Sequence, residues 1–205
     1  MMTGMNTESC DPAELAALRE IFAPRSEAAP PAGWEAVRSF EAEHGIVLPE
    51  PYRTFVAEVC DGLRAGPPYY GLLPFAQTPS DWGSDRPERL LAEPFPLTTT
   101  WMWENDEEGE EDEEALSEQE LEARTDAAFD HGSLLLGTDG CGMYWHLVVT
   151  GPRRGHVWLI DEYGAIPFGT SSMPGTPGFT GWVTHWAQGR SWFAGAPGDD
   201  PEEAA

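Results

Sequence analysis

The chain has 205 residues, 40% of them hydrophobic, and 36 acidic residues against 11 basic ones give it a formal net charge of −25. A chain of this length forms one domain that buries roughly 70% of its unfolded surface, and nine Trp and nine Phe supply material for a core. The charge disfavours nucleic acid and anionic membranes as partners and favours a basic protein. All eleven basic residues are Arg, which excludes chemistry that requires a lysine.

The N-terminal third predicts three helices. Segment 11–22, "DPAELAALREIF", has Asp11 as its N-cap and a proline at the first helical position. After a proline-rich break, apolar residues recur at helical spacing over 34–45 and stop at Gly45, where a left-handed residue is favourable. Segment 52–62 carries an apolar stripe at helical spacing that ends at an Asp-Gly pair.

The middle of the chain changes character. Residues 63–75 are rich in Gly, Pro and aromatics, which favours short extended pieces and turns. Residues 84–93 are compatible with a short helix, and residues 97–103, "LTTTWMW", are rich in strand formers. We therefore expect a sheet to begin in this region.

An acidic insertion is expected over residues 104–116, because its side chains are nearly all anionic and cannot enter a core. Ser117 and Glu120 then resemble a capping box, which predicts a helix reaching about Phe129. The carboxylates of this run are the candidate partner-binding residues: Glu104, Asp106, Glu107, Glu108, Glu110, Glu111, Asp112, Glu113 and Glu114.

Three strands are predicted next. "SLLLG" at 133–137 has the apolar character of a buried strand, and "MYWHLVV" at 143–149 places alternate residues on opposite faces. "HVWLI" at 156–160 follows the turn "TGPRRG", so the three strands form an antiparallel meander. An apolar stripe over 179–186 predicts a closing helix that ends at Gly189.

These elements predict an α+β fold: a single domain in which a mostly antiparallel sheet packs with N-terminal helices and a C-terminal helix. Residues 1–30 are expected to hold the first helix and a proline-rich connection, residues 31–190 the main domain with its acidic insertion, and residues 191–205 a polar, flexible tail.

Cysteine usage and the absence of a membrane signal predict a cytoplasmic protein. Cys10, Cys60 and Cys141 are widely separated and form neither a zinc spacing nor a disulfide framework, which is typical of reduced thiols. No basic leader with an apolar core and no run of about 18 apolar residues occurs.

The stretch "GTDGCGMYWHLVVTG", residues 137–151, could be a catalytic or phosphate-binding loop. Cys141 and His146 could serve as nucleophile and base, but positions five apart on a strand lie on opposite faces and about 16 Å apart. The glycines lack the third glycine of a dinucleotide site, and no Lys-Ser/Thr follows them. Residues 138–140 are therefore interpreted as a tight turn that leads into a strand.

The acidic run also imitates part of a calcium loop. Glu104, Asp106, Glu108 and Gly109 match its first ligand positions, but Ala115 stands where a bidentate Glu is required. Paired carboxylate catalysis needs a fixed separation on a scaffold, which this run does not supply. We expect no metal and no cofactor. The remaining histidines show no metal-ligand spacing and are interpreted as surface or helix-end residues: His44, His131, His156 and His185.

Four segments in order carry a family resemblance: "GWEAVRSFEAEHGIVLPEPYRTFVAEVCDG", "YYGLLPF", "GTDGCGMYWHLVVTGPRRGHVW" and "GFTGWVTHWAQG". Together they resemble the SMI/KNR-like branch of the SUKH superfamily over about residues 33–189. The resemblance implies a single α+β domain, and bacterial members of the family serve as immunity proteins that bind and neutralise toxins. It offers no catalytic positions to transfer.

The sequence therefore favours a non-catalytic protein-binding module, an immunity protein whose partner is a basic toxin. The acidic insertion could occlude a cationic cleft by imitating phosphate, or it could serve only to keep the protein in solution. The second hypothesis is a regulatory or scaffolding protein that binds an endogenous partner. The third, from another class, is a hydrolase that uses Cys141 or the carboxylates.

Overall fold

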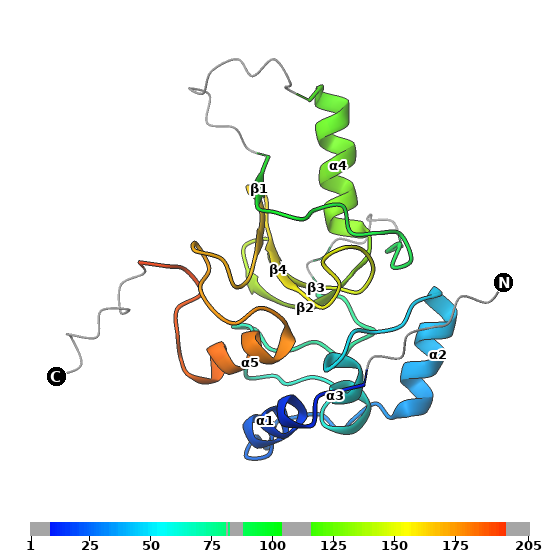
Figure 1. The fold of residues 1–205 in the computed structure, drawn as a ribbon, viewed down its shortest axis with the longest axis vertical. Coiled ribbons are helices and arrows are strands. Elements are labelled where there is room, and N and C mark those ends of the chain that lie inside the picture. The colour runs from blue at the N-terminus through cyan, green and yellow to red at the C-terminus, as the bar shows by residue number, and fades with distance from the viewer. Residues whose placement is uncertain (1–8, 81, 83–87, 104–115, 196–205) are drawn as a thin grey trace.

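The computed structural model describes residues 9–80, 82, 88–103 and 116–195. Within these ranges the chain forms five helices and five strands (Figure 1): α1 (Pro12–Phe22), α2 (Trp34–His44), α3 (Tyr52–Glu58), β1 (Trp101–Met102), α4 (Glu118–Asp130), β2 (Ser133–Gly140), β3 (Met143–Val148), β4 (Val157–Ile160), β5 (Gly164–Pro167) and α5 (Phe179–Ala187).

Local capping signals place the helix ends where the sequence predicts them. The side chain of Asp11 accepts a hydrogen bond from the Ala13 backbone N–H at 2.8 Å and so caps α1. Helix α2 ends at Gly45, which is left-handed with a φ of 65°. Ser117 and Glu120 form the reciprocal capping box at the start of α4. These predictions are confirmed.

The short helix proposed for residues 84–93 is wrong in its described part, 88–93. The backbone there bonds to the chain around the end of α4: Leu90 donates to the Asp130 carbonyl at 2.9 Å and accepts from Gly132 at 3.1 Å. A tertiary contact has therefore replaced the local helical hydrogen bonds that the composition allowed.

The sheet has the order β1-β5-β4-β3-β2, and every neighbouring pair is antiparallel. The predicted meander of β2, β3 and β4 is confirmed, and it is extended by β5 and by the edge strand β1. One row across the five strands consists of Trp101, Ala165, Ile160, Tyr144 and Thr138. The β2–β3 turn, the β4–β5 turn and the exit of β1 therefore lie at the same end of the sheet.

The turn between β2 and β3 lies two residues later than predicted. Residues 138–140 belong to β2, and Cys141 and Gly142 make the turn with φ values of 51° and 77°. Two irregularities in the pairing let β2 continue this far, and the Thr138 hydroxyl bridges the second one. It accepts from the Gly140 N–H and donates to the Met143 carbonyl, both at 2.9 Å. Strand β2 therefore continues through Gly137 and ends at Gly140.

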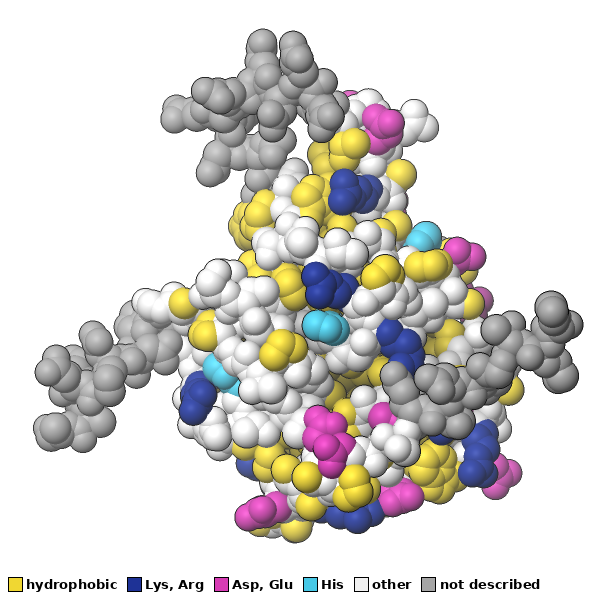
Figure 2. Space-filling model, in the orientation of Figure 1, with side chains coloured by type: hydrophobic (Ala, Val, Ile, Leu, Met, Phe, Trp, Pro, Cys, Tyr) yellow, Lys and Arg dark blue, Asp and Glu magenta, His cyan; other side chains and the backbone are white. Residues whose placement is uncertain are grey.

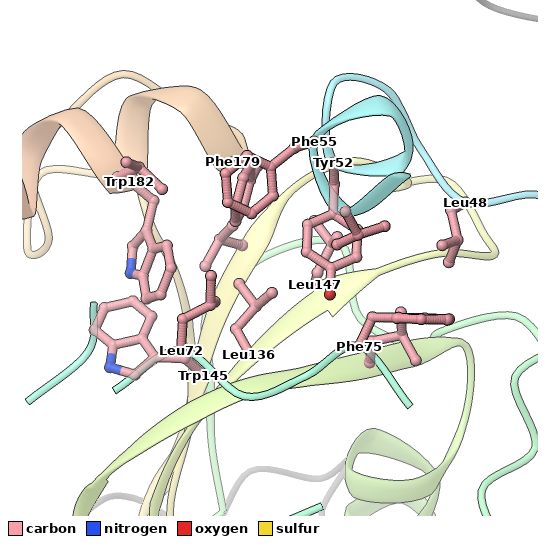
Figure 3. Packing of buried hydrophobic residues seen from close by; sticks show 14 of the residues in the cluster. Leu48, Tyr52, Phe55, Leu72, Phe75, Leu136, Trp145, Leu147, Phe179 and Trp182 are labelled. Carbon is pink, nitrogen blue, oxygen red and sulfur yellow. The ribbon is translucent and has the colours of Figure 1, made fainter. Parts of the chain in front are cut away.

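Both faces of the sheet are buried, in two separate clusters. On one face Trp145 and Leu147 pack with residues of α1, α2, α3 and α5. Figure 3 shows Tyr52 and Phe55 of α3 and Phe179 and Trp182 of α5 among them. On the other face Tyr144 and Trp158 pack with Phe129 of α4. The alternation predicted for β3 is confirmed, and the molecule is a single-domain α+β fold with α4 alone among the described helices on its side of the sheet (Figure 1).

The C-terminal helix α5 also follows the prediction, and two aromatic side chains at its end pack into the fold. His185 lies in the last turn of α5, which agrees with its interpretation as a helix-end residue, but its side chain is buried and its Nε2 donates to the Ser191 carbonyl at 2.6 Å. Trp192, placed by the sequence in the tail, stacks on Trp182 with ring centroids 5.8 Å apart. No helix in the described ranges has the length and apolarity that a membrane crossing requires.

Candidate protein-binding surface

The nine candidate carboxylates of residues 104–114 lie outside the described residues, as do the calcium-loop positions. The structure does describe the two segments that flank the run in sequence, namely the end of β1 with Trp103 and the start of α4 at Ser117. These flanks lie at the end of the sheet that also carries the β2–β3 and β4–β5 turns (Figure 1).

The catalytic alternative finds no assembled site in the described part of the chain. Cys141 is exposed in the β2–β3 turn, whereas His146 is fully buried in β3. His146 Nδ1 instead lies 3.0 Å from the Ser133 hydroxyl, and Arg89 donates to the Ser133 carbonyl at 2.6 Å. Hydrolases also pair serine with histidine, but both side chains here are fully buried, which suits a structural network rather than access for a substrate.

Metal binding likewise has no support among the described residues, which contain no group of three or more His, Cys, Asp or Glu placed to hold an ion. Cys60 is buried, and burial raises the pKa of its thiol to about 11. A thiol in that state is a weak nucleophile at neutral pH.

A groove of about 540 Å³ runs along α4 from Glu118 to Asp126. Helix α4 contacts the sheet through Phe129 near its C-terminal end, and its N-terminal half extends beyond the sheet (Figure 1). The side chains that line the groove are Trp103, Glu118, Gln119, Leu121, Glu122, Thr125 and Asp126. Among the described lining residues, Trp103 alone comes from outside α4.

The groove is acidic because of helical spacing. Glu118, Glu122 and Asp126 stand at positions i, i+4 and i+8, so they follow one another along a single face of α4. The one basic residue of α4, Arg124, lies with its guanidinium carbon 4.3 Å from the centroid of the Trp101 ring. Hydrogen bonds from Ser117 lower the pKa of Glu120, which keeps that neighbouring carboxylate ionised.

The aromatic wall of the groove is held in place. The indole N–H of Trp103 donates to the Glu162 carbonyl at 2.7 Å, and its backbone N–H donates to the Tyr163 carbonyl at 3.0 Å. Its ring packs against Trp101, with centroids 5.3 Å apart. Figure 2 shows apolar side chains gathered over β1 and α4 with a basic side chain among them. The groove thus pairs a fixed aromatic wall with a row of carboxylates.

Other exposed apolar side chains lie at the same end of the sheet. Met102 ends β1, Tyr163 lies in the β4–β5 turn, and Tyr69 and Tyr70 adjoin the end of β2. The sequence did not predict this gathering, because it depends on the pairing register of five strands. The acidic spacing on α4 was visible in the sequence, but the groove beside it was not.

The architecture is that of a small α+β domain built on an antiparallel meander, with the α4 groove and the exposed side chains of Tyr69, Tyr70, Met102 and Tyr163 at one end of the sheet. The model of the SMI1 / KNR4 family (SUKH-1) matches residues 31–174, and the chain belongs to this family. The resemblance drawn from the sequence is therefore confirmed. Comparisons with curated proteins and with solved structures gave no match. The matched range contains β1, α4 and every residue that lines the groove.

Proposed function

We propose that the chain is a non-catalytic immunity protein that binds a basic toxin, and that the groove between α4 and Trp103 is a contact surface for it. The observation that carries this proposal is the row of three carboxylates facing a fixed tryptophan. Membership of a family associated with immunity proteins supports it.

The physical basis is charge complementarity around an apolar anchor. A net charge of −25 steers a cationic protein toward the chain and raises its association rate. At the groove, Trp103 and Leu121 offer the apolar contact that anchors interfaces, and the acidic row selects basic side chains. The nine carboxylates of 104–114 adjoin both flanks in the sequence, and we propose that they extend the acidic surface and imitate phosphate.

The regulatory alternative uses the same surface for an endogenous partner, and it differs only in what is bound. The test is calorimetric titration of the full chain with the purified basic product of an adjacent gene, at about 50 and 300 mM salt. The groove variant carries Glu118→Gln, Glu122→Gln and Asp126→Asn. The control variant makes the same change in charge on α1 and α2, with Glu20→Gln, Glu35→Gln and Glu43→Gln.

We expect the groove variant to bind about tenfold more weakly than the control variant at the lower salt, because only the groove variant loses local contacts. The groove variant should also protect cells against the toxin less well than the control variant does. Equal weakening by both variants would reduce the effect to net charge and remove the groove from the proposal. Failure of any adjacent-gene product to bind, with a housekeeping protein bound instead, would favour the regulatory alternative.

A further inference from the structure

A second feature at the same end of the sheet is unusual for a surface. Tyr69 and Tyr70 are the two most exposed large apolar side chains among the described residues, with 79% and 63% of their area accessible. Their rings meet edge to face with centroids 5.1 Å apart. Isolated apolar residues on a surface need no explanation, but an adjacent exposed aromatic pair is typical of a contact site.

The backbone under this pair is fixed to the sheet. The Tyr69 N–H donates to Asp139 Oδ1 at 2.7 Å, and the Tyr70 N–H donates to the Thr138 carbonyl at 3.3 Å. The other oxygen of Asp139 accepts from the indole N–H of the buried Trp145 at 2.7 Å. One carboxylate therefore ties the exposed pair to the core.

Close backbone packing fixes the segment further. A Cβ on Gly137 would lie 2.3 Å from Pro68 Cδ, and one on Gly71 would lie 2.4 Å from the Leu63 carbonyl oxygen. Real Cβ atoms do not approach that closely, so the segment rests on β2 at a distance that only glycine permits. A surface that is already ordered binds without the entropic cost of ordering it.

We infer that Tyr69 and Tyr70 form an arginine-binding platform for the basic partner, an inference that rests on the proposed function. An aromatic face attracts a cation, and the planar guanidinium group also stacks on it, which the ammonium group of lysine does not do. The chain's net charge of −25 favours a cationic group as the occupant of this platform.

The platform and the groove are close enough to serve one interface. They lie at opposite edges of the same end of a five-stranded sheet, so about 19 Å separates the two edge strands at a strand spacing of about 4.8 Å. A standard interface buries about 800 Å² on each partner, which spans that distance. A single basic protein could therefore contact both.

The test uses two peptides of equal charge, nona-arginine and nona-lysine, titrated into the full chain at about 150 mM salt. The platform variant is Tyr69→Leu with Tyr70→Leu, which retains apolar bulk and removes the rings. Phe193→Leu, at another exposed aromatic residue, is the matched control. A thermal unfolding experiment on each variant checks that it folds.

We expect the platform variant to bind nona-arginine about five- to tenfold more weakly and nona-lysine less than about twofold more weakly. The groove variant should weaken both peptides alike. Unchanged arginine binding, or equal loss with both peptides, would overturn the platform. Self-association of the wild-type chain in sedimentation, abolished by the platform variant, would also overturn it by assigning the pair to a second copy.

These outcomes separate the platform from the proposed function. If the toxin fails to bind but the preference for arginine depends on the tyrosines, the platform stands and the immunity role fails. If the toxin binds and the platform variant affects neither the toxin nor nona-arginine, the immunity role stands and the platform fails.

Discussion

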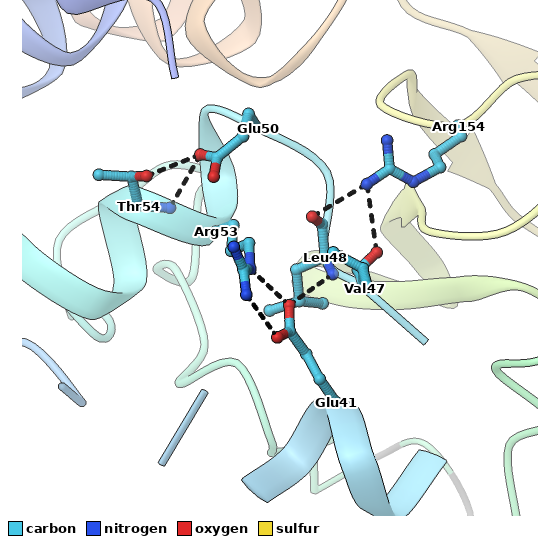
Figure 4. Close-up of polar contacts among 7 residues, drawn as sticks. All are labelled: Glu41, Val47, Leu48, Glu50, Arg53, Thr54 and Arg154. Carbon is cyan, nitrogen blue, oxygen red and sulfur yellow. Dashed lines mark hydrogen bonds and ion pairs between the residues drawn. The ribbon is translucent and has the colours of Figure 1, made fainter. Parts of the chain in front are cut away.

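Glu41 on α2 and Arg53 on α3 form a largely buried bidentate ion pair, with Arg53 Nε 2.7 Å from Oε1 and Nη2 2.8 Å from Oε2 (Figure 4). The Leu48 N–H donates to the same Oε1 at 2.9 Å. Arg154, in the β3–β4 turn, donates to the Leu48 carbonyl at 3.0 Å. The pair therefore joins two helices, and the segment between them is tied to the sheet.

Replacing Glu41 should be strongly destabilising. Glu41→Gln leaves the Arg53 charge in a mostly buried site without its partner, and we expect the free energy of unfolding to fall by about 3 kcal/mol. Urea denaturation measures this change. The surface pair of Arg19 and Glu58, with side chains 53% and 37% exposed, is the matched control. Arg19→Gln should cost less than about 1 kcal/mol, and equal costs would contradict a special role for the buried pair.

The contact between β2 and the tyrosine platform depends on the absence of a side chain at Gly137. Gly137→Ala puts a methyl group against Pro68 and should destabilise the fold by about 3 kcal/mol. Gly142→Ala meets no atom within 4 Å and introduces only the strain of a φ of 77°, about 1 kcal/mol. Thermal and urea unfolding compare the two variants. Equal stabilities would mean that Pro68 moves aside freely.

The exposed thiol of Cys141 and the buried thiol of Cys60 should differ in reactivity. Cys141 is exposed, whereas Cys60 is buried with a pKa raised to about 11 and donates to the Gly62 carbonyl at 3.0 Å. Iodoacetamide should therefore modify Cys141 rapidly in the native protein and Cys60 only after unfolding. Peptide mass spectrometry follows each site, and Cys141→Ser should abolish the fast phase. Modification of Cys60 at the native rate of Cys141 would show that the core opens readily.

Stability should fall in mild acid through His156. Burial, and then the nearby charge of Arg153, lower the pKa of His156 below its ordinary value of 6.5. The unfolded chain therefore takes up this proton at a higher pH than the folded chain does, so the contribution is fully present above pH 6.5 and is lost as the pH falls toward the folded-state pKa. Urea unfolding measures the free energy of unfolding between about pH 7.5 and 5.5. This free energy should change less steeply with pH in His156→Gln than in the wild-type chain. An unchanged slope would exclude His156 as its source.

Elements specified by local signals were predictable from the sequence. Helix α1 has its cap, and α2 has its glycine stop. Strand β5, "GAIP", was missed because its four residues resemble a turn and its pairing with β1 and β4 is non-local. The β2–β3 turn was predicted too early in the chain for a related reason, because glycines inside an irregular strand resemble glycines in a turn.

The proposed binding surface was only partly predictable. The helical spacing of Glu118, Glu122 and Asp126 could be found in the sequence, but a groove also needs Trp103 across from them, and that depends on how β1 pairs. Tyr69 and Tyr70 resemble core residues in composition. Only the packing of their segment on β2 shows that they face outward. The role of the nine carboxylates at 104–114 stays a prediction.

Helices α1 and α5 lie outside the matched range 31–174, yet they complete the core. Phe22 of α1 and Phe179 of α5 each meet Phe55 of α3, at centroid distances of 4.8 and 5.0 Å. A fragment cut to the family boundaries would leave Phe55 open to water on both sides and should not fold cooperatively. The segment that the family model matches is therefore shorter than the segment that completes the core, and transfer of the domain into another protein would require α1 and α5 as well.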